Sequence, residues 1–199
     1  MRRVHSEAAE QASGNVMRTL AMGSLVIDLN AQPLGRLSGP RELLLADPRH
    51  SMVLPHLVAI VEEFSRTQLI DRSLAAIDLS HPLRRSLWDN AEKRAEGSWD
   101  AQVDAWREWH GLNLSDAGAD YASLRAFVEA RNAIMHGLGR LTRKQLRKNG
   151  GRDVIAALGR VGISVSGATL SLPETVLLQC AAVARSFIEW LDIKIQGLP

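Results

Sequence analysis

The sequence predicts a mainly α-helical bundle with one small β-hairpin directly before the last helix. From residue 53 onward, apolar residues recur every three or four positions, which is the spacing of one face of an α-helix. Residues 162–172 instead alternate between apolar and polar on both sides of Ser166-Gly167-Ala168, as in a short hairpin. The hydrophobic fraction of 46% over 199 residues is enough for the core of one domain of ordinary size.

Residues 1–50 are predicted to form a loop-rich N-terminal extension that packs on a helical domain of residues 51–199. Residues 6–21 are compatible with a helix despite Gly14, and residues 25–29, LVIDL, with a short strand or an extended arm. Beyond them, prolines and glycines interrupt any long element: Pro33, Gly35, Gly39, Pro40 and Pro48.

Three helices are predicted before the middle of the chain. The first covers residues 53–71, with Pro55 in its first turn, and the second covers residues 83–96. The third is short, over residues 100–110, and Gly111 ends it. Trp99 and Trp106 have helical spacing there, so we expect these side chains to anchor the core.

The stretch of residues 121–139 carries the central predicted helix, which is expected to begin near residues 116–120. Its apolar positions share one side of the helix: Tyr121, Leu124, Phe127, Val128, Ile134, Met135 and Leu138. Arg131 falls on this apolar side, where an unpaired guanidinium would be costly. It therefore needs an anion, and an ion pair with Glu62, Glu63 or Glu129 would satisfy it without any function. Gly137 is expected to end the helix in a left-handed conformation.

The remaining elements follow from local signals. Thr142 and Gln145 have the spacing of a capping box, which predicts a short helix over residues 143–148. Residues 153–158 form one or two further turns. Pro173 then opens the last helix, whose apolar face includes the single cysteine, Cys180. One buried thiol excludes a disulfide framework and favours a reducing compartment. With no signal peptide or membrane span recognised, we expect a cytoplasmic protein without a membrane partner.

A basic segment follows the central helix. No Asp or Glu occurs between Ala130 and Gly151, whereas cations are frequent: Arg131, Arg140, Arg143, Lys144, Arg147 and Lys148. Such a segment attracts phosphate groups, although a solvated helix face has the same composition.

The polar residues of the central helix suggest a site. Asn132 and His136 are four positions apart, so their side chains can meet across one turn. A histidine at a helix end is also ordinary capping, and His110 followed by Gly111 repeats the same local pattern. Only His136 is accompanied by an arginine and an asparagine. The other histidines are scattered without ligand spacing, so no metal site is predicted.

The segment R-N-A-I-M-H, Arg131 to His136, resembles the arginine-to-histidine signature of HEPN domains, which ends a helix. The helix order from residue 53 to residue 195 is similar to that of stand-alone HEPN proteins of the RiboL-PSP type. The resemblance implies a helical bundle that often dimerises with its two motifs facing each other. In many members it also implies a metal-independent RNA endonuclease, a class that includes toxins and phage-defence effectors.

The resemblance assigns catalysis to Arg131, Asn132 and His136, and we expect Arg140, Arg143, Lys144 and Arg147 to bind the RNA. Histidine can move protons for attack by a 2'-hydroxyl, and arginine can stabilise the phosphorane-like transition state. One histidine cannot supply both a general acid and a general base, so a homodimer is expected to complete the site. No cofactor is expected.

Two expectations of the family remain open. An antitoxin or a defence-system partner is possible in such proteins. Leu138 stands where some members carry a tyrosine that a partner enzyme modifies, which makes this regulation doubtful here. The alternative function is a non-catalytic HEPN-like module that binds a protein or a nucleotide.

Overall fold

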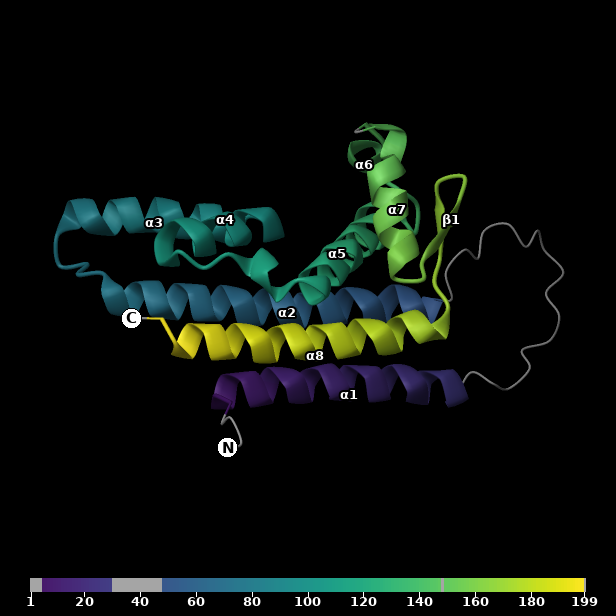
Figure 1. Ribbon diagram of the computed structural model, residues 1–199, viewed down its shortest axis with the longest axis horizontal. Coiled ribbons are helices and arrows are strands. Elements are labelled where there is room, and N and C mark those ends of the chain that lie inside the picture. Colours follow the sequence, from purple (N-terminus) through teal and green to yellow (C-terminus); the bar gives the residue numbers. More distant parts are fainter. Residues whose placement is uncertain (1–4, 30–47, 148, 199) are drawn as a thin grey trace, which may run out of the picture.

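The computed structural model describes residues 5–29, 48–147 and 149–198 and shows a mainly helical protein. Three long helices pack against one another as a bundle: α1 (Glu7–Leu29), α2 (Pro48–Ala76) and α8 (Glu174–Gln196). Figure 1 shows them side by side, with the other elements stacked over α2 and α8. A two-stranded hairpin lies directly before α8, so the predicted fold class is confirmed.

Helix α1 is part of this bundle. Ser6 caps its first turn, since the Ser6 Oγ accepts a hydrogen bond from the Ala9 amide at 3.2 Å. The buried Asp192 of α8 in turn accepts from the Ser6 amide at 3.0 Å. The helix predicted over residues 6–21 is confirmed, but the strand or arm expected at residues 25–29 was wrong because α1 continues to Leu29. A short apolar run does not distinguish strand from helix.

The loop-rich description was therefore wrong for residues 7–29. The boundary at residue 50 stays a prediction, and the proline- and glycine-rich residues 33–40 lie outside the described part of the chain.

Helices α3 (Pro82–Glu96) and α4 (Trp99–His110) form a second layer over the last turns of α2. Gly111 ends α4 with a φ of 65°, as predicted. Trp99 and Trp106 are buried, which confirms them as core residues, and the Trp106 indole donates to Ser65 Oγ at 3.0 Å. Helix α2, which was predicted over residues 53–71, extends five residues past its expected end.

Helix α5 (Ala119–Gly137) follows a 3-10 turn, η2 (Leu114–Ala117), and packs on α2 and α8. It ends one residue later than expected, because Leu138, not Gly137, adopts the left-handed conformation, with a φ of 53°. The predicted apolar stripe was wrong at its last two positions. Met135 is 57% exposed and Leu138 is 91% exposed.

A lobe of short elements projects from the end of α5 (Figure 1). It consists of α6 (Arg143–Arg147), η3 (Asn149–Gly151), α7 (Arg152–Arg160), β1 (Ser164–Ser166) and β2 (Thr169–Ser171). The hairpin turns at Gly167, with a φ of 62°, and pairs Val165 with Leu170. The Leu170 amide also donates to the Gly139 carbonyl at 2.9 Å, so the hairpin is hydrogen-bonded to the residues that follow α5.

Helix α8 begins directly after Pro173, as predicted, and its buried face includes Cys180. The predicted burial of the Cys180 thiol is confirmed, and this burial raises its pKa to about 12. None of the described helices is long and apolar enough to cross a membrane.

Candidate functional site

Arg131 makes an ion pair across the contact between α5 and α2. Its Nη2 donates to the Glu62 Oε2, and the side chains of Arg131 and Glu62 are only 25% and 15% exposed. Of the three carboxylates proposed as partners of Arg131 from the sequence, Glu62 is thus the one that forms the ion pair. Glu63 pairs with Arg66 and Glu129 accepts from Gln145 instead. The guanidinium on the apolar side of α5 is therefore compensated by charge from a helix far away in the sequence.

Asn132 belongs to the same polar cluster. The Arg131 Nη1 donates to the Asn132 Oδ1 at 3.2 Å. The second carboxylate oxygen of Glu62, Oε1, is buried and has no hydrogen-bond partner among the described residues. A buried oxygen of this kind is uncommon in a folded protein and marks a polar site that its own side chains do not saturate.

His136 lies one helical turn beyond Asn132 and is exposed to solvent. The structure shows no hydrogen bond between the two side chains, and His136 makes none with any other described residue. The contact that the spacing of Asn132 and His136 allows is therefore not made by a hydrogen bond. The structure brings Arg131, Asn132 and Glu62 together and leaves the imidazole of His136 open to solvent.

His110 is held in a different way, although its local sequence is similar. Its Nε2 lies 2.8 Å from the Ser73 Oγ, and the serine is buried. Burial lowers the pKa of His110, and the positive charge of Arg72 lowers it further, while a hydrogen bond with the Leu69 backbone acts in the opposite direction. Of these two histidines, only His136 is exposed and makes no hydrogen bond with a described residue.

The predicted basic residues all lie in the lobe, close in sequence to the end of α5. Arg140, Arg143, Lys144 and Arg147 are exposed, and none of them forms an ion pair with a described residue. Arginines elsewhere commonly do: Arg66, Arg84, Arg94, Arg107, Arg125 and Arg185 each lie within 4.0 Å of a carboxylate. These four cations are therefore not neutralised by ion pairs with described residues.

Two further cations were missed by the sequence reasoning. Arg152 and Arg160, at the two ends of α7, are exposed and lie in the same lobe. The sequence does indicate them, because the acid-poor basic segment continues to Pro173 with Asp153 as its one acidic residue. The basic segment predicted from the sequence ended at Gly151, one residue before Arg152.

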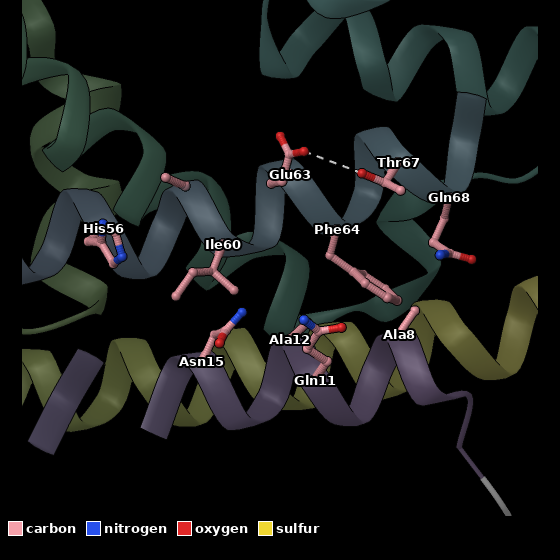
Figure 2. Close-up of a pocket in the computed structure, with 11 residues that line it drawn as sticks. Ala8, Gln11, Ala12, Asn15, His56, Ile60, Glu63, Phe64, Thr67 and Gln68 are labelled. Atoms are coloured by element: carbon pink, nitrogen blue, oxygen red, sulfur yellow. Dashed lines mark hydrogen bonds between the residues drawn. The ribbon is translucent and has the colours of Figure 1, made fainter. Parts of the chain in front are cut away.

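Other features of the described chain lie apart from this cluster. A hollow of about 470 Å³ between α1 and α2 is lined by polar side chains such as Gln11 and Asn15 over a floor that includes Phe64 (Figure 2). It contains none of the predicted site residues. Among the described residues, no three His, Cys, Asp or Glu side chains are grouped so as to hold a metal ion.

Together, the fold and the site define an α-helical protein with a half-buried Glu-Arg-Asn cluster, an exposed histidine and a basic lobe. No protein-family model, curated protein or solved structure matches the chain. The resemblance to HEPN domains stays a prediction that rests on residues 131–136 and on the order of the helices.

Proposed function

We propose that this protein is a metal-independent RNA endonuclease of the HEPN type, which cleaves RNA through attack of a 2'-hydroxyl on the neighbouring phosphate. The observation that supports this function best is the position of His136. This exposed imidazole lies one turn from the Arg131–Asn132 pair and at the base of the basic lobe.

The side chains are suited to the two tasks of this reaction. The imidazole of His136 is a chemical group that can serve as the proton acceptor or the proton donor of this reaction. Arg131 has five N–H donors, of which the contacts to Glu62 and Asn132 use two, so others remain for a phosphate oxygen. Glu62 holds the guanidinium in place and reduces its freedom before substrate binds.

A second copy of the chain would complete the site. One imidazole cannot act as general base and general acid in the same step, whereas two that face each other can. Met135 and Leu138 flank His136 and are largely exposed, and a partner protomer would remove their apolar surface from water. We therefore propose a homodimer with a composite site at the ends of the two α5 helices.

RNA would be held by the lobe. Arg140, Arg143, Lys144 and Arg147 bind the phosphate backbone, and we add Arg152 and Arg160 to this set. An enzyme that cleaves cellular RNA harms its host, so the proposal includes a role as a toxin or phage-defence effector in the cytoplasm, controlled by an antitoxin or a defence-system partner.

The test is RNA cleavage in EDTA by the purified protein and by a His136→Ala variant. Wild-type protein should cleave a pooled RNA substrate, and His136→Ala should lose this activity while it keeps its circular dichroism and melting temperature. His56→Ala, which removes another exposed histidine from α2, is the matched control and should cleave normally. Undiminished cleavage by folded His136→Ala would overturn the proposal.

A second candidate function is supported by the ion pair of Arg131 with Glu62. This pair satisfies the guanidinium within the protein, so no reaction is needed to explain it. The protein would then be a helical module that binds a protein or a nucleotide. Absence of cleavage by the wild-type protein, together with calorimetric binding of ATP or a related nucleotide, would favour this candidate over the nuclease.

A further inference from the structure

A hollow of about 350 Å³ is lined by residues of α2, α3 and α4. Figure 1 shows that α3 and the end of α2 lie at the end of the molecule away from the lobe. Trp88 and Trp109 line the hollow, with ring centroids 5.6 Å apart and planes inclined by 54°. Leu87 also lines it and is 61% exposed, so apolar surface continues out of the hollow. Two indoles beside open space offer a surface on which a flat aromatic ring can pack.

The lining of this hollow also includes polar side chains. Ser73 and His110 both line it, and the Ser73 Oγ lies 2.8 Å from the His110 Nε2. A hydroxyl can make one donated and two accepted hydrogen bonds, so the pair retains capacity for a polar group of a ligand. Because burial lowers the pKa of His110, its imidazole is neutral at neutral pH and brings no positive charge of its own.

Arg84 brings a guanidinium to this hollow. No Asp or Glu is among the described residues that line it. Arg84 is paired with Asp78 at 2.9 Å, but both side chains are about three-fifths exposed, at 59% and 62%. An exposed ion pair of this kind contributes little to stability, so an anionic ligand can compete with Asp78 for the guanidinium.

We propose that this hollow is a binding site for a small aromatic anion, of the aromatic carboxylate class. The ring packs against Trp88 and Trp109, and the anionic group binds the exposed guanidinium of Arg84. The site is separate from the Arg131–His136 cluster, so this inference does not depend on the proposed nuclease activity.

The five tryptophans provide the readout, because each indole N–H gives its own NMR signal. We would titrate 2-naphthoate into the full-length protein labelled with ¹⁵N and assign the signals with Trp88→Phe and Trp109→Phe variants. The signals of Trp88 and Trp109 should shift with saturation, while those of Trp99, Trp106 and Trp190 should move much less. Shifts spread equally over all five signals, or no saturation, would overturn the proposal.

Charge specificity is tested with 2-naphthamide, an uncharged ligand of the same size. It should bind about fivefold more weakly than 2-naphthoate, which corresponds to about 1 kcal/mol. Arg84→Met should remove this difference. Equal binding of the two ligands by the wild-type protein would show a general apolar surface, such as one that takes a side chain of a partner, and would contradict an anion site.

A final variant predicts a gain. Asp78→Asn frees Arg84 from its ion pair and should tighten 2-naphthoate binding several-fold without a change for 2-naphthamide. Asparagine retains the oxygen that accepts from the Ser80 amide, at 3.0 Å in the wild type, so the local turn should persist. Weaker naphthoate binding by a folded Asp78→Asn protein would contradict the assigned role of Arg84.

Discussion

Gln145 joins the basic helix α6 to α5 by two hydrogen bonds to Glu129. Its Nε2 donates to the Glu129 carbonyl at 2.9 Å and to the Glu129 carboxylate at 2.7 Å. The Gln145 Oε1 also accepts from the Thr142 amide at 2.9 Å, in the predicted capping box. A single buried amide thus fixes the start of the lobe against the turn of α5 that precedes Arg131.

The first prediction concerns this amide. Gln145→Leu leaves the Glu129 carbonyl and the Thr142 amide without their partner, at a cost of about 1–3 kcal/mol. Urea unfolding should show this loss, and the affinity for RNA should fall because α6 is no longer held in place. Lys144→Leu, a change on the exposed side of the same helix, should leave the free energy of unfolding almost unchanged. Equal stability of the two variants would contradict the anchoring role.

The second prediction concerns the ion pair at the candidate site. Glu62→Met or Arg131→Met alone leaves one half-buried charge unpaired. Breaking a fully buried ion pair costs about 3–5 kcal/mol, and each single variant should lose less than this because the pair is partly exposed. The double variant removes both charges and should recover part of this loss, yet it should not cleave RNA. Urea unfolding and the EDTA cleavage assay measure the two effects. If the double variant lost as much stability as the sum of the single variants, the pair would not be coupled.

The third prediction concerns the lobe. Replacing Arg143, Lys144 and Arg147 by Gln should weaken binding of single-stranded RNA and reduce the dependence of log affinity on log salt concentration. About 0.7 of slope is lost for each phosphate contact removed, so a reduction of about 2 is expected. Arg94→Gln with Arg107→Gln, which removes two ion-paired cations from α3 and α4, is the control and should change the slope little. If the control variant reduced the salt dependence as much as the lobe variant does, the lobe would not be the preferred binding surface for RNA.

The fourth prediction concerns pH. Burial and Arg72 lower the pKa of His110 in the folded protein, so below about pH 6.5 the unfolded chain binds more protons at this position than the folded chain. The stability that His110 contributes as a neutral imidazole is present above this pH and is lost as the pH falls toward the folded-state pKa. Urea unfolding at pH 7.5 and pH 5.0 should show a smaller difference in His110→Gln than in the wild type. If the difference between the two pH values were the same in His110→Gln and in the wild type, a lowered pKa of His110 in the folded protein would be contradicted.

Local signals in the sequence predicted most elements because each depends on residues close together in the chain. Gly111 ends α4, Gly167 turns the hairpin and Pro173 precedes α8, as expected. The strand at residues 25–29 was wrong for the same reason, since five apolar-rich residues fit either structure.

The partners at the candidate site could not be predicted in this way. The sequence by itself determined that Arg131 needs an anion, because a guanidinium stays charged wherever the helix packs. Only the tertiary structure decided that the anion is Glu62, 69 positions away, that His136 is hydrogen-bonded to neither Arg131 nor Glu62, and that Met135 and Leu138 are exposed. Those outcomes depend on how α5 packs against α2 and on where α5 ends. Helix packing brings together residues that are far apart in the chain, and their spacing in the sequence does not predict the contact.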